Sequence, residues 1–137
     1  RGDATFEDVS VAWGFTADSI SQGAALGDLD GDGDLDVVMN DLMDAPAIYR
    51  NNASAARIVV RLRGRAPNTR GVGASVTVLA AGMADQTQEI IAGGRYLGGD
   101  EPVRSFATGR AASVGLRVRW PSGRVSGWRV APVGPPA

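Results

Sequence analysis

The amino-acid sequence predicts an all-β protein with two parts: a propeller-blade-like four-stranded unit and a C-terminal β-sandwich or barrel-like domain. Three observations predict this fold class. Glycine (19 residues) and proline (7 residues) divide the 137-residue chain into short segments. No segment of helix length rich in Ala, Leu, Glu and Lys lies between them. Several segments alternate apolar and polar residues, which is the period of a half-buried strand.

The first part, residues 1–52, is predicted to form four short strands around one acidic loop. We expect these strands at residues 5–11, 23–29, 35–40 and 47–50. Residues 51–56 are small and polar, which is typical of a linker to the second part.

The second part, residues 57–131, shows the clearer strand pattern. Its alternation places one set of apolar side chains on a core face: Ile58, Val60, Leu62, Ala74, Val76, Val78, Val114, Leu116, Val118 and Trp120. Further strands are expected at residues 86–92, 103–107 and 125–130. Pro121 and Gly123 suit a tight turn that joins the last two strands into a hairpin. The proline-rich residues 132–137 are expected to form an extended tail.

The missing residue types exclude most enzyme chemistries. The chain has no cysteine and no histidine, and all 14 basic residues are arginine. These absences exclude Ser-His-Asp and Cys-His catalysis, lysine Schiff bases, zinc held by His or Cys, and the P-loop lysine. No apolar run approaches the roughly 20 residues that cross a bilayer. We therefore expect no enzymatic activity and no membrane span.

Charge is distributed unevenly along the chain. Residues 1–56 carry eleven acidic side chains against Arg1 and Arg50, whereas residues 57–137 carry twelve arginines against four acidic side chains. The first part is therefore strongly acidic and the second strongly basic.

The most informative segment is the acidic loop at residues 28–36, in which every second residue is aspartate. Carboxylates this close together repel one another unless a cation lies between them. Ca²⁺ takes about 6–8 oxygen ligands, and Gly31 and Gly33 let the backbone curve around an ion. We predict a Ca²⁺ site with side-chain ligands from Asp28, Asp30, Asp32 and Asp36 and the backbone carbonyl of Asp34. Mg²⁺ fits less well because it demands a tighter octahedron and keeps its waters.

An EF-hand is the competing interpretation of this loop. It shares the alternating acids, the glycine at the sixth position (Gly33) and the apolar eighth position (Leu35). Its twelfth position should be glutamate, but Met39 stands there and residues 37–39 continue as a strand. We therefore place the loop between strands and expect the ion to stabilise the fold. Extracellular calcium modules have dissociation constants on the order of 10⁻⁴–10⁻³ M, which indicates a secreted or cell-surface protein.

At this point the motifs resemble two known families. The first part contains four motifs that carry such a resemblance: Thr5-Phe6-Glu7-Asp8-Val9, Gly14-Phe15, residues 27–38 and Ile48-Tyr49-Arg50-Asn51-Asn52. They resemble an FG-GAP/VCBS repeat, the calcium-binding blade of integrin-α-like β-propellers. The second part contains four further motifs, at residues 60–64, 68–74, 94–97 and 118–123. They resemble the ASPIC/UnbV domain, although its usual Phe-Gly-Leu-Gly is here Phe106-Ala107-Thr108-Gly109. The resemblance implies an extracellular all-β protein in which the five loop aspartates serve as metal ligands.

A single blade leaves sheet edges and faces uncovered, because propellers contain several blades. The blade is expected to continue into a longer propeller, to pack on the second part, or to pack on neighbouring copies. The uneven charge would favour head-to-tail contacts between copies, which build a filament if they do not close into a ring.

Three functions remain open. We expect an extracellular calcium-stabilised binding or adhesion module whose ligand, a protein or a glycan, the sequence does not name. The alternative is a structural subunit that assembles into a filament or surface layer as a homo-oligomer. The third is a carbohydrate-active enzyme that uses Asp85 with Glu89 or Asp100 with Glu101, but such pairs in glycine-rich loops are usually just exposed.

Other features have simpler interpretations. A patch for nucleic acid or an anionic glycan is disfavoured for the arginines at residues 57–70, because no aromatic residues are interleaved among them and lysine is absent. These arginines are expected to be solvated or to pair with the acidic part. The large aromatics are expected to fill the core rather than form a sugar-stacking platform: Trp13, Tyr49, Tyr96, Trp120 and Trp128. Asn52-Ala53-Ser54 fits a glycosylation sequon, and the tripeptide Arg1-Gly2-Asp3 is interpreted as coincidence.

Overall fold

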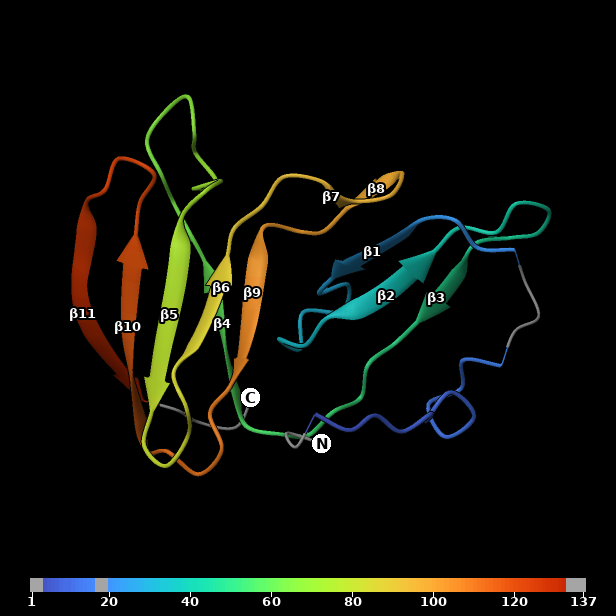
Figure 1. Ribbon diagram of the computed structural model, residues 1–137, viewed down its shortest axis with the longest axis horizontal. Coiled ribbons are helices and arrows are strands. Elements are labelled where there is room, and N and C mark those ends of the chain that lie inside the picture. Colours follow the sequence, from blue (N-terminus) through green and yellow to red (C-terminus); the bar gives the residue numbers. More distant parts are fainter. Residues whose placement is uncertain (1–3, 17–19, 133–137) are drawn as a thin grey trace.

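The computed structural model describes the backbone of residues 4–16 and 20–132 and the side chains of these residues up to 127. Eleven strands form in this part of the chain, and it contains no helix (Figure 1). The predicted all-β fold class is confirmed. The predicted tail at residues 133–137 and the tripeptide at residues 1–3 lie outside the described residues.

The first part of the chain forms an antiparallel three-stranded sheet in the order β1-β2-β3. Its strands are β1 (Ala24–Gly27), β2 (Asp36–Met39) and β3 (Ala47–Tyr49). Gly27 lies opposite Asp36 at the end of the β1–β2 ladder, so the acidic loop is the connection between these two strands. The placement of this loop between strands is confirmed.

The fourth strand predicted for this unit, at residues 5–11, is wrong. The chain turns there instead, with hydrogen bonds from Trp13 N–H to the Val9 carbonyl (2.9 Å) and from Phe15 N–H to the Ser10 carbonyl (2.9 Å). A strand needs a neighbour for its backbone groups and its apolar face. Phe6 is 98% exposed and Val11 84% exposed, so these two apolar side chains have found no such neighbour.

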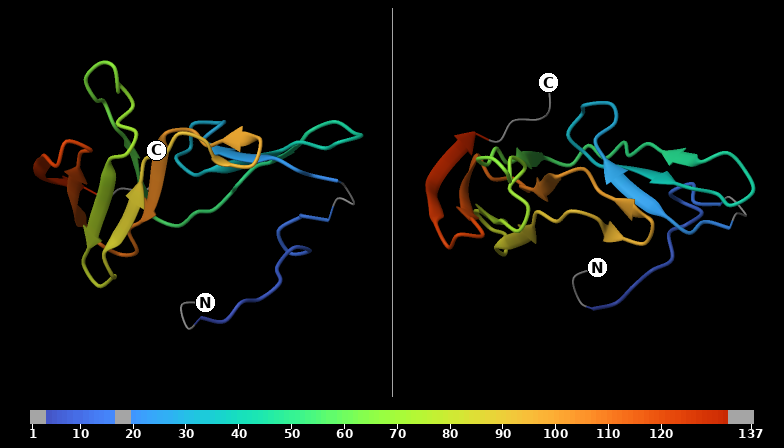
Figure 2. Two further views of the ribbon diagram at one scale, coloured as in Figure 1. Left: turned by 45° about the horizontal axis from the view of Figure 1, so that its top comes forward. Right: turned by 90° about the horizontal axis from the view of Figure 1, so that it is seen from above.

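The free edge of β1 is covered by the second part of the chain. Leu26 N–H donates to the Asp100 carboxylate (2.9 Å), and the Leu26 carbonyl accepts from Glu101 N–H (2.9 Å). The short hairpin of β7 (Gly94–Arg95) and β8 (Gly98–Gly99) extends to β1, where a Cβ on Gly98 would lie 2.8 Å from the Ala24 carbonyl oxygen (Figures 1 and 2). The three-stranded sheet thus packs on the second part of the chain along this edge.

The second part contains two further antiparallel sheets. One has the strand order β11-β10-β5-β6 and the other pairs β4 with β9. The strands are β4 (Arg57–Arg61), β5 (Ser75–Ala80), β6 (Gln86–Glu89), β9 (Val103–Ala107), β10 (Ser113–Arg119) and β11 (Val125–Pro132). Side chains link β6 to β9, because Gln86 donates to the Ala107 carbonyl (2.7 Å) and Gln88 donates to the Ser105 carbonyl (2.9 Å). These bonds join the two sheets along one edge of each.

The apolar core lies entirely in the second part. Its buried members are Val60, Ala74, Val76, Val78, Ala80, Ile90, Phe106, Ala111, Val114 and Val118. They come from both sheets, as the alternation of residues predicts. In the first part, the buried residues among those described are Asp34 and Asp36, so this part has no apolar core of its own.

The aromatic residues do not all fill the core as expected. Trp13 and Tyr96 are each 71% exposed, so the expectation is wrong for them. Trp120 is half-buried against the core and donates from Nε1 to Ser126 Oγ (2.7 Å). Tyr49 contacts the Phe15 ring with centroids 4.4 Å apart, and the side chain of Trp128 lies outside those described. The expectation fails for Trp13 because the first part offers no interior for large side chains, and for Tyr96 because it lies in the turn between β7 and β8, outside the core.

Two phenylalanines provide a matched test of this core. Phe106→Ala should lower the free energy of unfolding by about 3–5 kcal/mol, because the ring is 1% exposed and its loss leaves a cavity. Phe6→Ala removes the same ring where it is 98% exposed and should change stability by less than about 0.5 kcal/mol. Urea unfolding followed by Trp fluorescence measures both values, and equal effects would contradict this location of the core.

Candidate metal centre

Carboxylates of the acidic loop hold its backbone in a tight curve. The Asp28 carboxylate accepts hydrogen bonds from Gly31 N–H (2.9 Å) and Gly33 N–H (3.2 Å). The Asp32 carboxylate accepts from Asp34 N–H at 3.0 Å. Gly31 and Gly33 have φ values of 81° and 88°, a conformation that glycine adopts without the steric cost of a Cβ. The loop therefore needs glycine at these two positions.

Three of the five loop aspartates gather at one point. Asp28, Asp30 and Asp32 each offer a carboxylate oxygen, and these oxygens all lie within 4.8 Å of one another. An ionised carboxylate has about four lone-pair sites, so the N–H bonds to Asp28 leave it able to bind a cation. Oxygen-only ligands suit a hard cation such as Ca²⁺. These three residues could hold a metal ion, and their donor set fits calcium.

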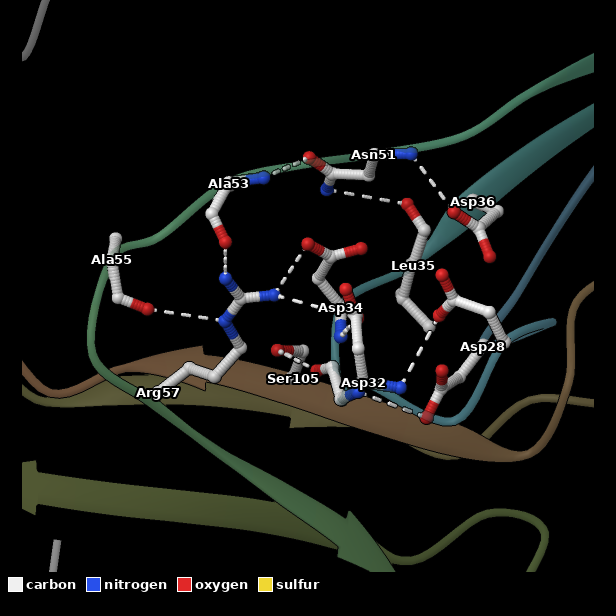
Figure 3. Close-up of polar contacts among 12 residues, drawn as sticks. Asp28, Asp32, Asp34, Leu35, Asp36, Asn51, Ala53, Ala55, Arg57 and Ser105 are labelled. Carbon is white, nitrogen blue, oxygen red and sulfur yellow. Dashed lines mark hydrogen bonds and ion pairs between the residues drawn. The ribbon is translucent and has the colours of Figure 1, made fainter. Parts of the chain in front are cut away.

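The other two aspartates make different contacts. Asp36 is buried, and its two oxygens accept from Leu29 N–H (2.9 Å) and Asn51 N–H (2.8 Å). Its carboxylate thereby ties the start of the loop to the chain that follows β3. The Asp34 carboxylate forms an ion pair with Arg57 Nη1 at 2.5 Å, as Figure 3 shows. That Asp36 binds the metal ion through its side chain, and Asp34 through its backbone carbonyl, stays a prediction.

Arg57 connects the loop to the second part. It stands at the start of β4, and its side chain is 8% exposed while that of Asp34 is 5% exposed. The guanidinium also donates to the Ala53 and Ala55 carbonyls (Figure 3). Arg57 is thus one of the arginines expected to pair with the acidic part.

A second set of contacts on the loop comes from Glu101, which the sequence did not identify as a contact residue. Its Oε2 accepts from Asp28 N–H at 3.2 Å, and its Oε1 pairs with Arg61. Ser105 Oγ donates to the Gly33 carbonyl at 3.3 Å. The loop therefore lies against the second part at its start and in its middle.

The expectation that Asp100 and Glu101 are merely exposed is wrong. Asp100 Oδ1 accepts from Leu26 N–H and pairs with Arg95 Nε at 2.6 Å. Burial favours the neutral acid, but the hydrogen bonds from Arg95 and Leu26 N–H, together with the charges of Arg95 and Arg104, outweigh it and lower the pKa of Asp100. The one feature of the sequence that could have indicated these contacts was an acidic pair in a part otherwise rich in arginine.

A cavity of about 650 Å³ lies next to the loop. Its walls include Trp13, Phe15, Leu35, Val37 and Tyr49, with Arg50 among the polar residues. Arg50 Nη2 also pairs with Asp30 Oδ2 at 2.6 Å, so the cavity and the carboxylate cluster share a residue.

The fold and this loop define an all-β protein with an oxygen-lined candidate cation site at the junction of two parts. Residues 64–134 match the family model described as ASPIC and UnbV, and the chain belongs to this family. The chain is also similar to Cartilage acidic protein 1 of Mus musculus, with 28% identity over 132 residues that cover 91% of the chain. It spans 20% of the length of that relative. Among the described residues, no helix is long and apolar enough to span a membrane.

The buried ion pair gives the second prediction. Arg57→Met should destabilise the protein by about 3–5 kcal/mol, because it leaves the Asp34 charge buried without its partner. Arg50→Met removes an arginine that is 64% exposed and should cost about 0–1 kcal/mol. Both are measured by urea unfolding in calcium-free buffer. Equal losses would show that burial of the pair does not matter.

The lowered pKa of Asp100 gives a pH prediction. A carboxyl group whose pKa is lower in the folded state adds stability above its unfolded pKa, and this stability is lost as the pH falls through the folded value. Asp100→Asn should therefore lower the free energy of unfolding by about 1–2 kcal/mol at pH 7. The difference from the parent protein should shrink towards pH 3 and below. Thermal melts across this range measure it, and a constant difference would disprove the ionic contribution.

Proposed function

We propose that the chain is an extracellular, calcium-stabilised binding module without catalytic activity. The observation that carries this proposal is the convergence of the Asp28, Asp30 and Asp32 carboxylates in the β1–β2 connection. A bound Ca²⁺ would neutralise this cluster and allow the two strands to pair without repulsion across the loop. Ion binding would then contribute to folding stability by mass action.

Two further observations support calcium. The motifs of the first part resemble an FG-GAP/VCBS repeat, and the loop aspartates occupy the ligand positions that this resemblance implies. The buried Asp36 carboxylate and the Asp34 carbonyl complete the proposed set, with water filling the remaining positions.

The proposed location outside the cell rests on the relative and on the chemistry of the site. The name of the relative links that protein to cartilage. Extracellular calcium modules bind with dissociation constants on the order of 10⁻⁴–10⁻³ M and are filled by millimolar calcium. A site built from one short loop suits that range.

The absence of catalysis is proposed from the available side chains. The chain has no histidine, cysteine or lysine to serve as base or nucleophile. Asp100 and Glu101, one of the two candidate acid pairs, accept backbone N–H groups and pair with arginines, so their carboxylates serve the contact between the two parts. The proposed role is therefore binding, with the domain surface as the site of contact.

Calcium-dependent melting tests this function. Calcium at ten times its dissociation constant should stabilise the protein by about 1.4 kcal/mol, so the melting temperature should rise by several degrees over that in chelator. Asp30→Asn and Asp32→Asn should each reduce this shift, because both remove a charged ligand. Asp44→Asn, an exposed aspartate outside the cluster, should leave it unchanged.

The same melts can reject the proposal. A parent protein with identical melting temperatures in millimolar calcium and in chelator would contradict the calcium site. A shift that Asp44→Asn reduces as much as Asp30→Asn would indicate general screening of the acidic part instead of a specific site.

A further inference from the structure

The second part ends in an exposed basic surface that the calcium site does not use. We name it the arginine end and define it by five exposed side chains: Arg63, Arg65, Arg70, Arg119 and Arg124. They come from the loop at residues 62–73 and from the β10–β11 hairpin at residues 117–125. These two segments hold six arginines, with Arg117 as the sixth, and no aspartate or glutamate.

Close packing brings the two segments together. A Cβ on Gly71 would lie 3.1 Å from the Trp120 ring, and one on Gly73 would lie 3.2 Å from Pro121 Cγ. The loop therefore rests directly on the turn of the hairpin. Figure 1 shows both at the same end of the β-sheets, whereas the connection from β9 to β10 that carries Arg110 is at the opposite end.

Hydrogen bonds within the loop fix its shape. Gly64 N–H donates to the Thr69 carbonyl at 2.8 Å. The Asn68 side chain accepts from Val72 N–H and donates to the Val72 carbonyl, each at 2.8 Å. A surface that is already ordered loses little conformational entropy when it binds a partner.

Among the described residues, no acidic side chain pairs with the five side chains that define the arginine end. Arg57, Arg61 and Arg95 have carboxylate partners. Within the described chain, none of the five guanidinium groups at the arginine end has a hydrogen bond or an ion pair. An acid near this surface is Glu89, which pairs in register with Ser75, and Ser75 pairs in register with Arg119. Glu89 therefore lies two strands from Arg119, at about 10 Å. Salt screens most of an exposed interaction over that distance.

We propose that the arginine end binds a sulfated polysaccharide. A guanidinium group can donate two parallel hydrogen bonds to an oxyanion such as a sulfate group. Several guanidinium groups side by side also favour a polyanion, because binding releases the counterions of that polyanion. This proposal gives the binding role described above its ligand class and rests on that role, although it does not depend on calcium.

Two other polyanionic partners fit the observations less well. Single-stranded nucleic acid needs exposed aromatic rings for its bases, and at this end Trp120 is half-buried with its Nε1 bonded to Ser126. The acidic part of a second copy has fewer free carboxylates than its sequence suggests, since Asp30 already pairs with Arg50 and Asp34 with Arg57. An external anionic chain is therefore the favoured partner.

Calorimetric titration of the whole chain with a heparin oligosaccharide tests the proposal. At about 0.1 M salt, the triple variant Arg63→Gln, Arg65→Gln and Arg70→Gln should bind at least tenfold more weakly than the parent protein. The slope of log affinity against log salt should fall in magnitude by roughly 2–3, if each lost contact releases about one counterion as on DNA. Arg110→Gln, also exposed, should change the affinity less than twofold. Circular dichroism should show unchanged folding for both variants.

Several results would overturn the proposal. One is an equal loss of heparin affinity in Arg110→Gln and in the triple variant. Another is equal affinity of the parent protein for heparin and for a DNA duplex of the same charge. The third is self-association without heparin that the triple variant abolishes. Titrations with calcium and with chelator separate the two proposals. If the parent protein binds heparin but its melting temperature does not respond to calcium, the calcium site is contradicted and the arginine end is not.

Discussion

The ion pair between Asp34 and Arg57 is the contact on which the arrangement of this protein most depends. The first part has no apolar core among its described residues, so hydrophobic burial cannot hold the acidic loop in place. Removing two charges from water is costly unless they are paired, and here they lie 2.5 Å apart while the arginine also donates to two backbone carbonyls. The pair therefore ties the middle of the acidic loop to the start of β4.

The second part and the proposed cation act on different groups of the same loop. Arg57, Glu101 and Ser105 contact the Asp34 carboxylate, the Asp28 N–H and the Gly33 carbonyl. The carboxylates of Asp28, Asp30 and Asp32 remain together as the candidate ligands. Docking of the second part therefore shapes the loop in which these ligands lie, and the acidic and basic halves of the chain meet at this junction.

Coverage of sheet edges explains how a single three-stranded sheet is tolerated. The segment around Gly98 and Asp100 lies along β1, and Leu26 there finds both a donor and an acceptor. Such covering removes an edge on which another strand could add. The apolar side chains of Phe6, Val11 and Met43 stay exposed, so the second part does not cover the whole of the first.

Local patterns determined the strands of the second part, the turn after Trp120 and the place of the acidic loop, because alternation and turn chemistry are properties of neighbouring residues. Tertiary structure alone decided the rest. The bond from Asp28 to Glu101 joins residues 73 positions apart, and no local signal encodes it. The segment at residues 5–11 contains strand-forming residues but pairs with no strand of the described chain, and Trp13 finds no interior. A strand or a buried ring exists only when another part of the chain supplies its partner.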